Sequence, residues 1–148
     1  MTIQDRLTEA MKAAMKAKDS VRLGTIRMMR TAIKNREIEN RAELSETDAI
    51  SVLSTLVKQR RESAEAFLQG GRAELAAKED QELAVIQEFL PEPLSDEEIR
   101  RIIDEAVAET GAVSMKDMGK VMKLVTPRTV GRAEGRRVSE QVKARLAG

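Results

Sequence analysis

Apolar residues recur every three or four positions through almost the whole chain, and nowhere do they alternate with period two for long enough to indicate a strand. This spacing places apolar side chains along one face of a helix. The first stretch shows the pattern, because Leu7, Met11 and Met15 lie four residues apart. Helix-forming residues dominate the composition and only three prolines interrupt it. The sequence therefore predicts an all-α fold.

Capping and breaking residues divide this pattern into seven helices. Ser95 and Ser114 stand where a serine can cap the start of a helix, and Gly111 stands where a glycine ends one. We expect the sixth helix, which Ser114 would cap, to end before Pro127. The predicted helices cover about residues 2–18, 20–41, 45–69, 72–90, 96–110, 114–126 and 133–146.

The stretch FLPEPLSDEEI, residues 89–99, predicts a boundary between two parts of the chain. Pro91 and Pro93 end the fourth helix and stiffen a short connection. Ser95 with Glu98 then forms the pattern of a capping box at the start of the fifth helix. We therefore place a four-helix N-terminal domain at residues 1–91 and a three-helix C-terminal domain at residues 94–148.

The composition excludes several kinds of chemistry. The chain has no cysteine and no histidine, which excludes disulfides, thiolate nucleophiles, Ser-His-Asp triads and Cys/His zinc sites. No phosphate-binding P-loop pattern is present and no carboxylate pair stands out as a metal site. We identify no catalytic residue, no metal site and no cofactor, and we do not expect the chain to be an enzyme on its own.

Apolar runs are short throughout. None is long enough to cross a membrane, and the N-terminal stretch lacks the apolar core of a secretory signal. We therefore expect a cytoplasmic protein that does not contact a membrane.

Charge is distributed unevenly along the chain. Residues 62–111 hold 4 basic and 14 acidic residues, whereas residues 112–148 hold 9 basic and 3 acidic residues. A net charge of +1 for the whole chain hides this asymmetry. Residues 1–61 hold 13 basic and 8 acidic residues, and a basic C-terminal end after an acidic segment indicates a surface that faces a polyanion.

The basic end contains two groups of candidate phosphate contacts. On a helical wheel, three lysines fall on the side opposite the apolar stripe, which fits either a nucleic-acid surface or an ordinary solvated face. In TVGRAEGRRV, glycines stand beside arginines at a predicted helix start, which favours phosphate; alternatively Gly131 sets a turn and Gly135 allows close helix packing. The candidate RNA-binding residues are Lys116, Gly119, Lys120, Lys123, Arg128, Gly131, Arg132, Arg136 and Arg137.

No aromatic side chain accompanies these basic residues, because the only aromatic residues are Phe67 and Phe89. Proteins that bind single strands stack bases on aromatic rings. If the C-terminal part binds nucleic acid, we therefore expect contacts to phosphates and ribose and recognition of shape, as with folded RNA.

Two sets of basic residues in the N-terminal part can be interpreted without a nucleic-acid ligand. Arg27, Arg30 and Lys34 lie near one face of the second predicted helix, where they either extend a basic surface or form a solvated face. Arg60 and Arg61 lie close in sequence to Glu62 and Glu65, and we expect local ion pairs there.

The strings FLPEPLSDEEI, MKDMGKVMKLV and GRAEGRRVSEQVKARL together resemble the GatB/YqeY family. Residues 94–148 are similar to the tail domain of the GatB subunit of the aspartyl/glutamyl-tRNA amidotransferase, and the whole chain resembles the stand-alone YqeY-type member. The family often has a Gly-x-Ala-Asp-Gly pattern, and Glu134 stands here where the aspartate is usual. The resemblance implies a tail that contacts tRNA, with Gly119, Lys120 and Lys123 as contacts. In that family the amide-transfer chemistry lies in other domains and subunits.

Three functions remain open from the sequence. The first is an accessory module that binds tRNA or a tRNA–enzyme complex, with a possible protein partner in translation. The second is an auxiliary component of an amidotransferase, that is, of a carbon–nitrogen ligase with glutamine as amido-N-donor. The third is a protein–protein adaptor that docks a partner through the acidic segment 62–111 and its methionine-bearing helices.

Overall fold

The computed structural model describes all residues, 1–148, and confirms the all-α prediction. It contains no strand, and its helices follow one another with short connections. The chain divides into two compact units, Met1–Pro91 and Glu92–Gly148, here called the N-terminal and C-terminal units. The elements are α1 (Ile3–Ala17), α2 (Ser20–Asn40), α3 (Glu46–Gln69), α4 (Ala73–Gln87), α5 (Asp96–Thr110), the 3₁₀ turn η1 (Met115–Asp117), α6 (Met118–Thr129) and α7 (Gly135–Ala147).

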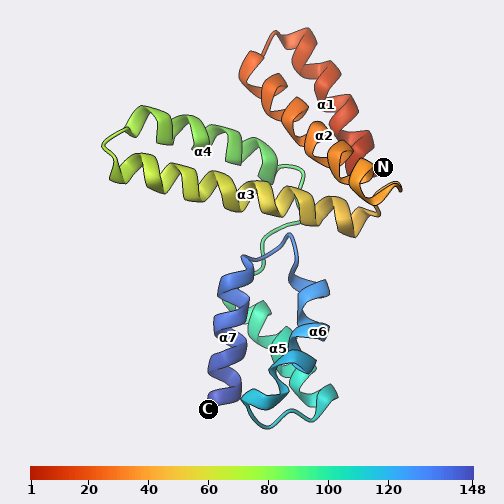
Figure 1. The fold of residues 1–148 in the computed structure, drawn as a ribbon, viewed down its shortest axis with the longest axis vertical. Coiled ribbons are helices and arrows are strands. Elements are labelled where there is room, and N and C mark those ends of the chain that lie inside the picture. Colours follow the sequence, from red (N-terminus) through yellow and green to blue (C-terminus); the bar gives the residue numbers. More distant parts are fainter. The chain divides into compact units, whose positions relative to one another are not determined.

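The N-terminal unit consists of two helical hairpins that cross one another. Figure 1 shows α1 beside α2 and α3 beside α4, and α2 packs across both helices of the second hairpin. The side chains that fill the crossing are aliphatic or methionine. They lose all or nearly all of their exposed surface, which is the main stabilising contribution to a fold of this kind. The largest fully buried side chains of this core are Leu7, Ile26, Met29, Leu53 and Ile86.

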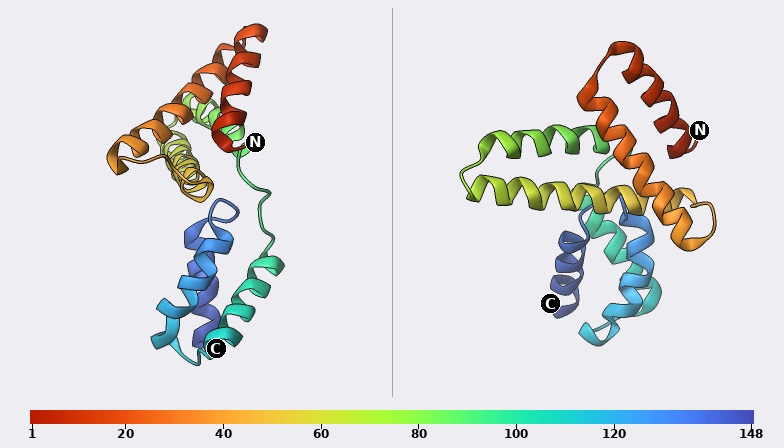
Figure 2. Two further views of the ribbon diagram at one scale, coloured as in Figure 1. Left: turned by 90° about the vertical axis from the view of Figure 1, so that its right-hand side faces the viewer. Right: turned by 45° about the horizontal axis from the view of Figure 1, so that its top comes forward.

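The C-terminal unit is a bundle of α5, α6 and α7 with a core of its own. The views of Figure 2 show the three helices gathered around one another, and α6 contacts both of the others. Most buried side chains of this core are isoleucine or valine, which are β-branched and lose little rotamer entropy when they are buried in a helix. Its largest fully buried side chains are Ile99, Ile103, Val121, Val125, Val138 and Val142.

Short-range signals fix most of the helix ends. The Oγ of Ser45 accepts a hydrogen bond from the N–H of Asp48 at 3.1 Å, and Gly111 ends α5 with a φ of +68°, where glycine is favoured. At Ser95 only half of the predicted capping box forms. The Ser95 hydroxyl accepts from the N–H of Glu98, but the Glu98 carboxylate accepts from that hydroxyl and not from the Ser95 backbone.

The predicted end of the sixth helix is wrong. The segment starts as the separate turn η1, and α6 then runs through Pro127 to Thr129. A proline in the last turn removes one backbone donor, which costs a single hydrogen bond at that point of the helix. Val125 and Thr129 are both buried on either side of Pro127, and their packing against the core holds the last turn in place.

The apolar stripe of the first helix also differs from the prediction at one position. Met15 is 51% exposed, and Ala14 is buried in its place. The connection to α2 follows directly, with Lys18 in the left-handed region and Asp19 capping α2. The end of α1 therefore packs only through a small side chain, which lets α2 turn back closely.

None of the helices is both long and apolar enough to span a membrane.

Candidate nucleic-acid interface

Three exposed lysines line the outer side of η1 and α6, and we call them the lysine face: Lys116, Lys120 and Lys123. The opposite side of α6 carries Val121 and Val125, which are fully buried and orient the helix on the core. Lys116 lies in the 3₁₀ turn, so the three lysines do not share one continuous α-helix as the wheel assumed.

No carboxylate forms an ion pair with any lysine of this face. Asp117 is the acidic residue closest to it in the chain, and its Oδ2 accepts a hydrogen bond from the N–H of Val113 at 3.0 Å. The carboxylate therefore closes the turn before α6 instead of neutralising a lysine. The three ammonium groups remain available to an anionic ligand.

Gly119 leaves an open surface beside these lysines. It lies in the first turn of α6, where a glycine destabilises a helix by about 0.5–1 kcal/mol relative to alanine. A Cβ added there would meet no heavy atom within 4 Å, so no contact within the protein requires the glycine. Gly119 stands four residues before Lys123, so the two adjoin on the surface of α6, and Lys116 precedes it by three residues in η1.

The four arginines of the candidate set have partners inside the C-terminal unit. Arg128 pairs with Glu105 of α5 at 2.6 Å, and Arg136 pairs with Glu140 one turn further along α7 at 3.3 Å. The other two arginines contact residues at or just before the start of α5. Arg137 binds Asp96, and the Nε of Arg132 donates to the backbone carbonyl of Glu92 at 3.2 Å.

The glycine-rich turn before α7 is mainly a structural element. Gly131 has a φ of +76°, where glycine is favoured, and the next carbonyl, that of Arg132, accepts from the N–H of Leu94 at 2.7 Å. Gly135 does not serve close packing, because a Cβ added there would meet nothing within 4 Å. The turn closes the bundle by joining α7 to the segment that leads into α5.

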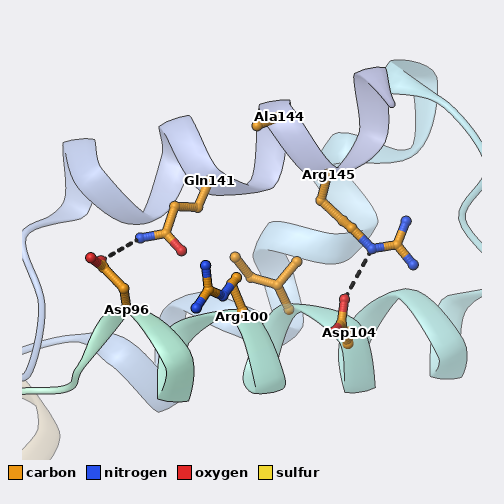
Figure 3. Close-up of a pocket in the computed structure, with 7 residues that line it drawn as sticks. Asp96, Arg100, Asp104, Gln141, Ala144 and Arg145 are labelled. Atoms are coloured by element: carbon orange, nitrogen blue, oxygen red, sulfur yellow. Dashed lines mark hydrogen bonds and ion pairs between the residues drawn. The ribbon is translucent and has the colours of Figure 1, made fainter.

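A groove of about 700 Å³ between α5 and α7 carries a second set of charges (Figure 3). At one end the Nε2 of Gln141 donates to Asp96 at 3.0 Å, and at the other the Nε of Arg145 donates to Asp104 at 2.9 Å. The hydrogen bond from Arg137 is the largest cause that lowers the pKa of Asp96 below its usual value. Both carboxylates accept hydrogen bonds from side chains of α7, which makes the groove an electrostatic seam between the two helices.

The sequence did not reveal this seam. The carboxylates lie on α5 and their partners on α7, far apart in the chain. The one available signal was that the acidic residues of α5 and the polar or basic residues of α7 each recur after one or two helical turns, so that each set lies on one helix face. The structure thus separates the predicted set into lysines without carboxylate partners and arginines that have partners within the unit.

Comparison with protein families gives one match that covers nearly the whole chain. Residues 4–146 match the family described as Yqey-like protein. Relatives named altered inheritance of mitochondria protein 41, mitochondrial, show 34% identity over 119 residues in Vanderwaltozyma polyspora, 41% over 85 residues in Eremothecium gossypii and 31% over 121 residues in Lachancea thermotolerans. These alignments cover 76%, 57% and 77% of this chain and 64%, 46% and 65% of the respective relatives. The chain therefore spans less than two thirds of the length of these relatives.

The names of the relatives overturn one prediction. The lack of a secretory signal and of long apolar runs led us to expect a cytoplasmic location, yet these relatives are all named as mitochondrial proteins. The prediction of a cytoplasmic location is therefore wrong. The absence of a secretory signal and of a membrane-spanning run does not distinguish the cytoplasm from the interior of a mitochondrion.

Proposed function

The chain belongs to the YqeY-like protein family, and from that premise we propose that its C-terminal unit binds folded RNA through the lysine face. The RNA we propose is tRNA, free or in complex with an enzyme that acts on it. The protein is then an accessory module that positions or holds the RNA. We propose no reaction of its own for this module.

One observation carries this proposal: the lysine face gathers three exposed cations of the basic segment 112–148 that form no ion pair. A cation that is already paired with a carboxylate offers less net attraction to a phosphate, because binding must first break or share the pair. A free ammonium group releases a condensed counterion from the nucleic acid when it binds a phosphate, and that release drives association.

The surroundings of the lysine face support a backbone-binding mode. The C-terminal unit has no aromatic side chain on which a base could stack. Gly119 adds a place without a side chain beside Lys116 and Lys123, so a ribose or phosphate can approach the helix backbone closely. Contacts to phosphate and ribose recognise the shape of a folded RNA more than its sequence.

Reversing the charge of the lysine face should abolish most of this binding. For Lys116→Glu/Lys120→Glu/Lys123→Glu, we expect the plot of log Kobs against log salt concentration to become shallower by about three units, one for each lost phosphate contact. Fluorescence anisotropy of labelled total tRNA at several salt concentrations measures this slope. Circular dichroism should show unchanged helicity, because all three side chains are exposed.

A matched control separates a local contact from a change in net charge. Lys58→Glu/Arg72→Glu/Lys78→Glu alters the net charge by the same amount at exposed positions of the N-terminal unit that form no ion pair. We expect this control to bind tRNA with a slope close to that of the wild-type protein. An equal loss in both variants, or no loss in the lysine-face variant, would contradict the proposal.

The Gly119→Ala variant should change stability and binding in opposite directions. Alanine should stabilise α6 by about 0.5–1 kcal/mol, because the site has open space and helical backbone angles. The same methyl group should hinder close approach of the RNA and weaken tRNA binding severalfold. Urea unfolding followed by circular dichroism measures the first effect, and anisotropy measures the second. A gain in stability with unchanged affinity would show that the glycine does not contact RNA.

A further inference from the structure

The N-terminal unit carries a second basic surface that the proposed function does not use. Residues 1–41 hold ten basic and five acidic residues, so the hairpin of α1 and α2 has an excess of positive charge. Most of its carboxylates are already engaged. Asp5 accepts from the Thr2 backbone in the capping box of α1, Asp19 caps α2, Glu39 pairs with Arg36, and Glu37 accepts from the N–H of Leu44 at 3.0 Å.

A groove between α1 and α2 gathers three of these cations. It has a volume of about 530 Å³ and a floor that includes Leu7 and Ile33, both buried. Arg27, Arg30 and Lys34 line it from α2, and we call these three residues the groove cations. None of them forms an ion pair.

The other groups in the groove do not neutralise these charges. Glu37 is the one carboxylate that lines it, and one of its oxygens already accepts from the Leu44 backbone. The Nη1 of Arg30 lies 2.8 Å from the Sδ of Met11, which is a weak acceptor and leaves the guanidinium charge in place. The uncharged polar side chains that line the groove and can donate hydrogen bonds include Gln4, Thr31 and Asn35.

An ordinary solvated helix face would be expected to mix charges of both signs. Arg30 and Lys34 instead stand at i and i+4 as like charges, which destabilises a helix by about 0.2–0.5 kcal/mol. Arg27 stands three residues before Arg30 and adds to the same repulsion. A bound polyanion would convert this repulsion into attraction at all three positions, and the adjacent amide and hydroxyl groups would bind phosphate oxygens.

We propose that this groove is a second phosphate-binding site and that it holds the sugar–phosphate backbone of the same RNA that the lysine face binds. The inference rests on the proposed function for the identity of the ligand. Two modest phosphate sites on one chain raise overall affinity, because binding at one raises the effective concentration of the RNA at the other. On this proposal, each of the two units contributes one phosphate-binding site.

The test compares three variants with the wild-type chain by anisotropy of labelled total tRNA at several salt concentrations. The groove variant is Arg27→Gln/Arg30→Gln/Lys34→Gln, and the lysine-face variant is the triple reversal described above. The matched control is Lys58→Gln/Arg72→Gln/Lys78→Gln, which removes three exposed cations from the other hairpin of the same unit. Glutamine keeps much of the aliphatic stem and removes the like-charge repulsion, so we expect the groove variant to fold.

We expect the groove variant to bind tRNA with a salt slope shallower by about two to three units, while the control keeps the wild-type slope. A groove variant with the wild-type slope would overturn the inference, and the proposed function would stand if the lysine-face variant still loses binding. The converse result, loss in the groove variant alone, would support the groove and reject the lysine face. Absence of binding by the wild-type chain would reject both.

A competition with pyrophosphate distinguishes RNA from a small phosphate ligand. Pyrophosphate should displace tRNA only at concentrations far above those of the RNA, because it offers two phosphates where the backbone offers many. If pyrophosphate binds the wild-type chain tightly and the groove variant not at all, while the tRNA slope is the same in both, the groove serves a small phosphate compound and the assignment to RNA is wrong.

Discussion

Replacing Arg60 with alanine should lower the free energy of unfolding of the N-terminal unit by about 2–4 kcal/mol, somewhat less than for a fully buried ion pair, since the loss of the cation leaves partly buried carboxylates without compensation. The Nε of Arg60 lies 3.4 Å from Glu79 and 3.0 Å from Glu82, both on α4. All three side chains are only 19–21% exposed. Removal of the guanidinium leaves two partly buried carboxylates that repel each other and have lost their cation. Urea unfolding followed by the helical circular dichroism signal measures the loss, because the chain has no tryptophan or tyrosine to report it.

Arg61→Ala is the matched control for this prediction. Arg61 is the next residue of α3, is exposed and forms no ion pair, so its loss should change stability by less than about 0.5 kcal/mol. Adding Glu79→Gln and Glu82→Gln to the Arg60→Ala variant should restore part of the lost stability, because the uncompensated charges disappear. If it restores none, the loss comes from the contact between the arginine and Met28 and not from the charges.

Arg60 also shows where sequence reasoning fails. Its nearest carboxylates in the chain are Glu62 and Glu65, and the prediction of local ion pairs with them is wrong. The true partners lie on the neighbouring helix of the hairpin. Which residues of two helices meet depends on how their ridges interlock, and a helical wheel drawn for one helix carries no information about that.

Helix positions were predictable because the signals that set them are local. Ser45 caps α3 through its side-chain hydroxyl, and Gly111 ends α5 because glycine readily adopts the left-handed backbone conformation. The course of the chain through Pro127 was not predictable in this way. The local preference of proline opposes helix there, and burial of Val125 and Thr129, which is a property of the folded bundle, overrides it.

The candidate interface could be predicted as a region but not as a set of contacts. Counting charges assigned the lysines and the arginines of residues 116–137 to one basic end of the chain, because a count registers sign and number only. The folded chain gives Arg128 and Arg137 carboxylate partners on α5. Those partners belong to the acidic segment that charge counting treated as a separate surface. The proposed RNA contacts on the lysine face are therefore fewer than the basic residues of the tail.

The Ile103→Ala variant should lose about 2–5 kcal/mol of stability in the C-terminal unit, the usual range for removing the bulk of a buried isoleucine. Ile103 is 1% exposed and belongs to a core that shares no residue with that of the N-terminal unit. A unit as small as residues 92–148 has little stability to lose. We therefore expect much of it to be unfolded at 37 °C. Hydrogen exchange read by mass spectrometry should show lost protection in α5, α6 and α7 and unchanged protection in α1 to α4.

Leu53→Ala is the counterpart in the other core, where Leu53 is fully buried, and it should deprotect α1 to α4 while leaving α5 to α7 protected. These variants also help to interpret the RNA-binding experiment. We expect Ile103→Ala to lose RNA binding because the C-terminal unit unfolds, whereas we expect the lysine-face variant to lose binding while it stays folded. If the lysine face is the main contact, Leu53→Ala should retain salt-dependent binding, weakened by the contribution of the groove. Equal deprotection of all seven helices in both variants would mean that the two units unfold together, and the separate cores would then not act as separate folding units.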